Sequence, residues 1–173
     1  MIFQFWEGIY ALVYNLKSVG GKNDIILFNR KRYKGADLKL TSGEIIKKGD
    51  ELLELHLNNR VIYNFYNNSG SLIKAMIILK NEFESNLKKL ADFMKDNKNF
   101  DNVKGLMGIT YFYKIAEMKG FDIIDVRNPI INIGQRLLLY LYNEEAFRNM
   151  LKKGFESKMV IISKEKLCNM YGK

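Results

Sequence analysis

The stretch that decides the fold is residues 71–95, SLIKAMIILKNEFESNLKKLADFMK. Its apolar residues recur every three or four positions, the spacing that gives an α-helix one apolar face. These residues are Leu72, Met76, Leu79, Phe83, Leu87, Leu90 and Met94. Charged residues such as Lys74, Glu84 and Lys88 take the opposite face. The spacing therefore predicts a long amphipathic helix over 71–95.

The residues before this helix follow the pattern of short strands. In 51–58, ELLELHLN, leucines alternate with Glu54, His56 and Asn58, which predicts a strand with one apolar and one polar face. Runs bounded by glycine turns predict three more strands, at 25–33, 36–40 and 44–47. We expect the β-rich part, 25–60, to form a small antiparallel sheet or partial barrel.

Two segments after the long helix share one pattern, in which a helix ends at a Gly-Phe pair and a strand follows. Glycine suits the left-handed conformation that ends many helices. The expected elements are a strand at 105–109, helices at 111–119 and 143–153, and strands at 121–126 and 159–162. Ser163 is expected to cap a last short helix. Residues 71–173 thus complete a single α+β domain that spans 1–173.

The N-terminal segment is expected to be a helix over 1–20, because its apolar residues recur at helical spacing. Such a helix either packs on the core or lies in a membrane interface through residues 1–17. The chain has no run of eighteen apolar residues, and the N-terminus lacks a basic leader and a cleavage pattern. We expect a cytoplasmic location, with a membrane-peripheral one as the alternative.

Composition restricts the classes of function. The 173 residues carry 28 Lys and Arg against 19 Asp and Glu, a net charge of +9. The basic residues are spread along the chain and no nucleic-acid-binding motif is present, so nucleic-acid binding is the third choice. One cysteine, Cys168, and one histidine exclude an internal disulfide and argue against a Cys/His zinc site. We expect no metal and no cofactor.

Several arginines are candidates for contact with a ligand. In an extended strand, Arg30, Arg32 and Lys34 would share one face, where they are either solvated or face an anion. Arg127 follows the end of a strand and Arg136 comes shortly after it. Ligands often bind beyond the ends of strands in α/β proteins, so both arginines are candidates.

His56 is the only histidine, and any imidazole base must be this residue. Glu54 lies on the same strand face, about 7 Å away along the strand, where a carboxylate can orient the ring. Asn58 extends this polar stripe. The stripe is either a half-exposed face, the lining of a ligand site or a catalytic site. Motifs for a serine nucleophile, a phosphate loop or a dinucleotide site are absent.

The segment 33–59, YKGADLKLTSGEIIKKGDELLELHLNN, resembles the YkoP-like domain family. The Gly120-Phe121 pair and the ending at 162–172 resemble that family as well. The resemblance implies a bacterial protein of the Bacillus or Clostridium type, loosely associated with the cell envelope. The family occurs alone or C-terminal to polysaccharide deacetylase domains and brings no established activity. The chain lacks the deacetylase metal motifs, and the resemblance adds Asp50 to the candidate residues.

Two hypotheses follow. The first is a non-catalytic accessory or ligand-binding module for an anionic or glycan-type ligand. The second is an acyltransferase-like enzyme, because the helix, Gly-Phe, strand units resemble the later half of the acetyltransferase fold. The candidate ligand residues are Arg30, Arg32, Asp50, Glu54, His56, Asn58, Arg127 and Arg136.

Overall fold

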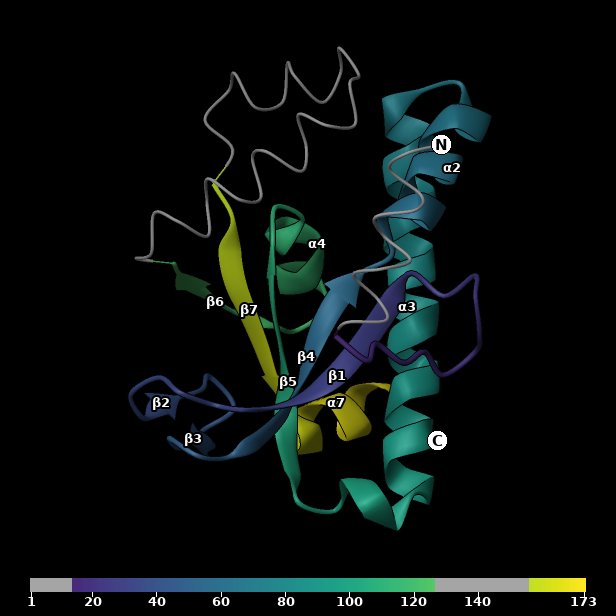
Figure 1. The fold of residues 1–173 in the computed structure, drawn as a ribbon. Helices are drawn as coiled ribbons and strands as arrows, with labels where there is room; N and C mark the ends of the chain where they lie inside the picture. Colours follow the sequence, from purple (N-terminus) through teal and green to yellow (C-terminus); the bar gives the residue numbers. More distant parts are fainter. Residues whose placement is uncertain (1–13, 127–155) are drawn as a thin grey trace.

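The fold is centred on a five-stranded mixed sheet (Figure 1) in a computed structural model that describes residues 14–126 and 156–173. The order across the sheet is β1-β4-β5-β7-β6. The strands are β1 (Ile26–Arg32), β4 (Glu51–Leu57), β5 (Val103–Thr110), β7 (Lys158–Ser163) and β6 (Asp122–Asp125). Neighbours are antiparallel except β4 and β5, which are parallel. The last strand in the chain therefore lies inside the sheet.

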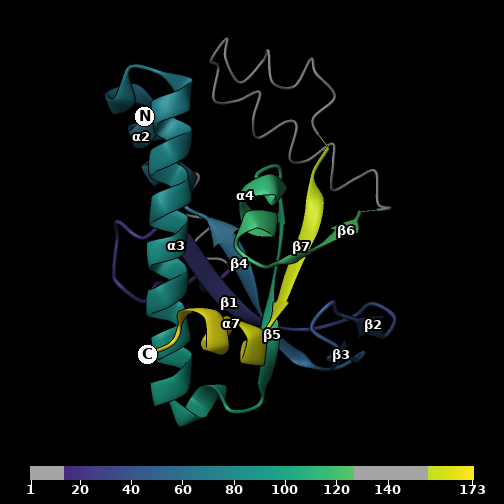
Figure 2. The same cartoon turned by 180° about the vertical axis from the view of Figure 1, so that it is seen from behind.

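Helices cover one face of this sheet, as the view from behind shows (Figure 2). They are α2 (Asn59–Ser69), α3 (Leu72–Asp96), the 3-10 helix η1 (Lys98–Phe100), α4 (Tyr113–Met118) and α7 (Lys164–Tyr171). Leu87, Leu90 and Met94 of α3 are fully buried in one core cluster with Leu53 and Leu106 of the sheet. The apolar spacing of 71–95 thus gives the packing face that it predicts.

A short hairpin covers part of the opposite face. It consists of β2 (Leu38–Lys39) and β3 (Ile45–Ile46). Its buried side chains form a second core cluster with β4 and β7; the cluster contains Tyr33, Leu40, Ile46, Leu52 and Ile161. The Thr41 backbone N–H also donates to the Asp122 carboxylate at 2.7 Å. The hairpin is therefore held to the sheet by apolar contact and by hydrogen bonding.

Serine side chains cap two helices, and the cap at Ser163 is the one expected from the sequence. Ser71 Oγ accepts from the Lys74 N–H at 3.2 Å at the start of α3, and Ser163 Oγ accepts from the Lys166 N–H at 3.1 Å at the start of α7. Each bond satisfies an N–H group that the first turn of a helix leaves unpaired. Gly120 has a φ of +87° after α4, as its place after a helix predicts.

The parallel pairing of β4 with β5 shapes the whole fold. Parallel neighbours need a crossover connection, and here α2 and α3 form it. The α+β class predicted from sequence is confirmed. The β-rich part does not form a closed barrel, however. β2 and β3 form a two-stranded antiparallel sheet, whereas β1 and β4 belong to the same mixed sheet as the C-terminal strands, because β4 pairs with β5.

Some parts of the chain differ from the expected elements, and others lie outside the described residues. Helix α2 is not predicted from the sequence. Residues 14–20 contain a turn and an antiparallel bridge between Lys17 and Phe28, instead of the end of a helix over 1–20. Residues 1–13 and the helix expected at 143–153 lie outside the described residues, as do Arg127 and Arg136. Within the described ranges, no helix is long and apolar enough to cross a membrane.

Candidate functional site

The polar stripe of β4 lies on the sheet face opposite α3. Leu53 faces the helices and is fully buried, so Glu54 and His56 face the other way. Across the sheet, Glu54 is paired with Asn29 of β1 on one side and with Met107 of β5 on the other. The centre of this face therefore combines an amide, a carboxylate and a thioether in one row.

Glu54 is the electrostatic centre of this face. The Lys31 ammonium forms an ion pair with Glu54 Oε1, and His56 Nε2 lies 3.5 Å from Glu54 Oε2, at the long limit of a hydrogen bond. The Glu54 and His56 side chains are only 16% and 17% exposed. Burial opposes ionisation of Glu54, but hydrogen bonds from His56 and Lys31 and the Lys31 charge outweigh it and lower its pKa to about 2. The carboxylate is therefore charged at any ordinary pH.

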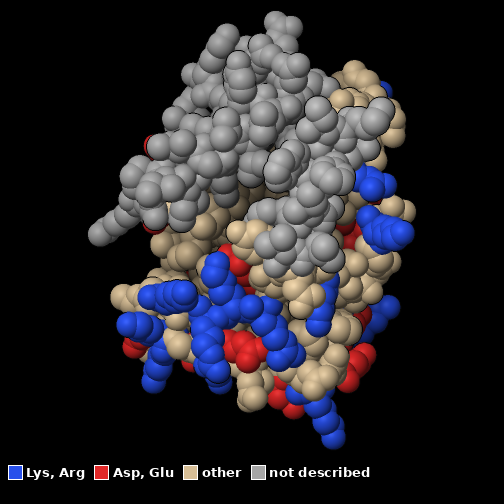
Figure 3. Space-filling model, viewed as in Figure 1, with Lys and Arg blue, Asp and Glu red and all other residues tan. Residues whose placement is uncertain are grey.

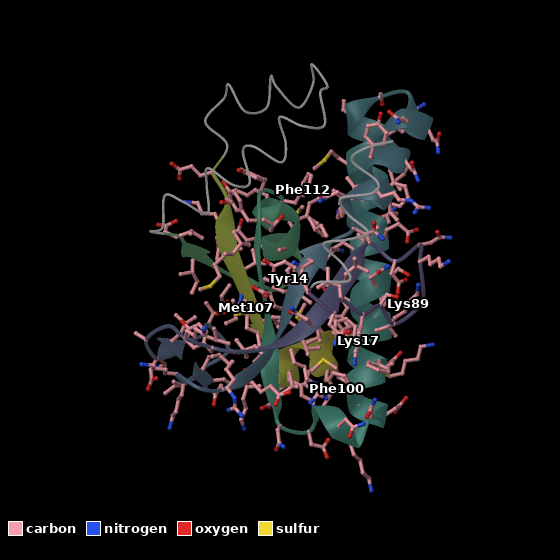
Figure 4. The ribbon with its side chains drawn as sticks, viewed as in Figure 1. Tyr14, Lys17, Lys89, Phe100, Met107 and Phe112 are labelled. Carbon is pink, nitrogen blue, oxygen red and sulfur yellow. The ribbon has the colours of Figure 1, made fainter. Side chains whose placement is uncertain are left out.

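An aromatic ring from the N-terminal side of the chain approaches His56. The Tyr14 and His56 ring centroids are 6.2 Å apart, with the rings tilted by 45°. Tyr14 is held in part by its carbonyl, which accepts from Asn29 Nδ2 at 3.3 Å. Figure 4 shows Tyr14 and Met107 over the central strands. Tyr14, Asn29 and Lys31 are not predicted as site residues, because the strand pairing that brings them here is not visible in the sequence.

The structure does not bring Arg30 and Arg32 to this stripe. Arg30 alternates with Lys31 and so lies on the helix-covered face, where its guanidinium is 4.5 Å from the centroid of the Phe100 ring. Arg30 also lies 2.9 Å from a Glu51 carboxylate oxygen. Arg32 Nη1 donates to the Gly49 carbonyl at 3.2 Å. The cation beside Glu54 is therefore Lys31, and both arginines contact other parts of the chain.

Asp50 and Asn58 support turns. Asp50 Oδ2 accepts from the Lys47 N–H at 2.8 Å, which closes the turn before β4. Asn58 Nδ2 donates to the Asp24 carbonyl at 3.1 Å, after the end of β4. The chain turns into α2 at Asn58, so its amide leaves the Glu54–His56 stripe. Their role toward a ligand stays a prediction, as does that of Arg127 and Arg136.

Figure 3 shows Lys and Arg gathered on the lower part of the viewed face, over the β2–β3 hairpin and the neighbouring strand ends. Exposed lysines there are Lys34, Lys39, Lys47 and Lys48. Within 14–126 and 156–173, no group of three or more His, Cys, Asp or Glu side chains is placed to hold a metal ion. The polar groups around Glu54 that could contact a ligand are its carboxylate, the His56 imidazole and the Lys31 ammonium.

Comparison with known proteins gives one family. The model of the YkoP domain matches residues 1–171. The chain belongs to the YkoP domain family. It is similar to "Uncharacterized protein YkoP" of Bacillus subtilis (strain 168), with 30% identity over 146 residues that cover 82% of this chain and 78% of the relative. No solved structure matches. The resemblance noted in 33–59 is thus confirmed for this YkoP-family protein.

The charged state of Glu54 gives this YkoP-family protein a pH-dependent stability. The folded-state pKa of about 2 lies below the ordinary glutamate value of 4.5, so the ionised carboxylate stabilises the fold above about pH 4.5. We expect Glu54→Gln to lower the free energy of unfolding at pH 7 by about 1–2 kcal/mol, since solvent screens the half-exposed Lys31. The gap should close as the pH falls from about 4.5 to about 2. Urea unfolding at several pH values measures it.

The matched control is Glu117→Gln, which removes the carboxylate of an exposed pair on α4 with Lys114. An exposed pair contributes little, so this variant should follow the wild type at every pH. A stability gap for Glu54→Gln that is the same at pH 3 and pH 7 would contradict the assigned role of the Glu54 charge.

Proposed function

We propose that this YkoP-family protein is a non-catalytic binding module, and that it binds a glycan-type ligand on the sheet face around Glu54 and His56. The observation that supports the proposal is the Glu54 carboxylate, which stays charged and only partly exposed between Lys31 and His56. Small-molecule sites combine a mostly apolar surface with a few oriented polar groups. Met107 and Tyr14 supply such a surface beside these charges.

The charge of the site favours a polyhydroxylated ligand over an anion. A carboxylate only accepts hydrogen bonds, so Glu54 suits sugar hydroxyl groups and repels a phosphate or another carboxylate. Arg30 and Arg32, the groups best suited to an anion, contact Phe100, Glu51 and Gly49 instead. The half-exposed Tyr14 ring offers an apolar surface for the face of a sugar. The resemblance of the family to a domain next to polysaccharide deacetylases points the same way.

Calorimetric titration tests the proposal. The ligands are N-acetylglucosamine oligomers, their deacetylated forms and, for the anionic alternative, inorganic phosphate. We expect a glycan oligomer to bind the wild type, and Glu54→Gln to weaken its binding about tenfold or more, because a charged hydrogen bond is lost. His56→Gln should weaken it as well. The control variant Glu117→Gln changes a residue of α4, away from the β4 stripe, and should bind the glycan like the wild type.

Two results would overturn this assignment. One is the absence of binding to every glycan by the wild type. The other is equal affinity of the wild type and Glu54→Gln, which would place the ligand elsewhere. Binding of phosphate alone would favour the anionic ligand.

A second candidate is acyl transfer, and the topology favours it. The order β1-β4-β5-β7-β6, with β4 and β5 the parallel pair, is similar to the strand order of the acetyltransferase fold. His56, oriented by Glu54, would then take a proton from the acceptor amine or hydroxyl. A fold does not assign chemistry, and the link from β4 to α2 is Asn58 alone, without the glycine-spaced loop of that fold. Calorimetric titration with acetyl-CoA distinguishes the two candidates. Binding heat with acetyl-CoA, and none with the glycans, would favour acyl transfer.

A further inference from the structure

The tip of the α2–α3 hairpin, residues 59–81, carries exposed apolar side chains. This part of the two helices extends past the end of the sheet in both ribbon views (Figures 1 and 2). Ile73 is 74% exposed and Ile77 is 55% exposed, and Ile78 beside them is 36% exposed. The same helix buries Leu79 and Leu87 against the core. The exposed isoleucines therefore lie outside the packing face of α3.

Ile73 and Ile77 form one patch with lysines at its borders. Residues four apart on a helix lie within about 40° of each other around its axis, so Ile73 and Ile77 share a face. Lys80 lies next to this face on one side and Lys74 lies on the other, and both are exposed. The surface combines two large apolar side chains with two cations.

The whole tip is basic. Residues 59–81 contain three basic residues, Arg60, Lys74 and Lys80, and no acidic residue. Farther along the same face of α3, Glu84 is paired with Lys88 at 3.1 Å and with Lys119. The part of the tip visible in Figure 3, at the upper right, is tan and blue. Residues 59–81 therefore contain no carboxylate that would repel a negatively charged partner.

We propose that this tip binds the surface of an anionic membrane. Ile73 and Ile77 would enter the boundary between headgroups and acyl chains, and Lys74 and Lys80 would lie at the level of the acidic headgroups. A second copy of the chain fits less well, because a symmetric contact through the patch brings the lysines of both copies together. The surface is separate from the Glu54 site, which lies on β4.

Sedimentation of the full chain with lipid vesicles tests the proposal. One vesicle type contains phosphatidylglycerol and phosphatidylcholine, and the other contains phosphatidylcholine alone. We expect binding to the anionic vesicles only. It should weaken strongly between 0.1 M and 1 M NaCl, because the Debye length falls from about 10 Å to about 3 Å. The variants Ile73→Asn/Ile77→Asn and Lys74→Gln/Lys80→Gln should each weaken binding about tenfold or more.

The control is Met118→Asn on α4, which changes another apolar side chain that is 61% exposed. It should bind like the wild type. All the altered residues are exposed, so each variant should keep the thermal stability of the wild type. The proposal is overturned by a wild type that does not bind anionic vesicles, and by tip variants that bind as the wild type does. It is also overturned if the tip instead forms a dimer in sedimentation velocity that Ile73→Asn/Ile77→Asn abolishes.

Discussion

Alanine in place of Leu87 is expected to lower the free energy of unfolding by about 3 kcal/mol. Leu87 lies in the middle of α3, is fully buried and belongs to the core cluster between that helix and the sheet. Truncation removes buried apolar atoms and leaves a cavity that the surrounding side chains fill only in part. Urea unfolding at pH 7, followed by circular dichroism, measures the difference from the wild type.

The same helix supplies the control. Ile77→Ala removes an apolar side chain that is 55% exposed, so we expect it to change the free energy of unfolding by less than about 0.5 kcal/mol. If Leu87→Ala and Ile77→Ala cost the same, α3 does not pack on the sheet through the face described above.

Gly105→Ala is expected to cost about 2–3 kcal/mol of stability. Gly105 lies in β5, between β4 and β7. A Cβ atom at this position would lie 2.4 Å from the Ile162 carbonyl oxygen and 3.2 Å from the Ser163 Cα. Both contacts are to backbone that is part of the sheet, so no side chain can move aside to relieve them. Thermal and urea unfolding of the variant measure the effect.

Gly108→Ala, three residues along the same strand, is the matched control. Its nearest contact would be the Leu55 carbonyl oxygen at 3.1 Å, so a shift of a few tenths of an ångström accommodates it. We expect a cost below about 1 kcal/mol. If Gly108→Ala destabilises the protein more than Gly105→Ala, the close approach of β5 and β7 is not the reason that position 105 requires glycine.

Much of the fold is predictable because its signals are local. The apolar spacing of 71–95 and the alternation in 51–58 give α3 and β4 within a residue or two of their observed bounds. Ser163 and Gly120 mark helix ends as expected, since a cap acts within a few residues of the helix it ends. These features depend only on neighbours in the sequence.

Other features depend on contacts between distant residues. Helix α2 contains several asparagines, a residue with low intrinsic helix propensity, and it is stabilised by packing of Val61 and Ile62 in the core. The parallel pairing of β4 with β5 joins segments that α2 and α3 separate. No periodicity in either strand reports its partner, so the single mixed sheet is not predictable from the sequence.

The candidate site was partly predictable for the same reason. Glu54 and His56 lie on one strand, so alternation places them on a common face. Alternation also places Arg30 and Arg32 on one face of β1 and Lys31 on the other, but it does not tell which of these faces carries Glu54. That choice follows from the antiparallel register, in which Asn29 lies opposite Glu54 and Lys31 is its diagonal neighbour.

The position of β7 has a consequence for synthesis on the ribosome. β7 begins at Lys158, yet it lies between β5 and β6 and pairs with both. Until it leaves the exit tunnel, the nascent chain holds β5 and β6 with unpaired backbone edges that can pair with other chains. The sheet is completed only after β7 has been translated, so chaperones that shield such edges should matter more for this protein than for one whose central strands emerge first.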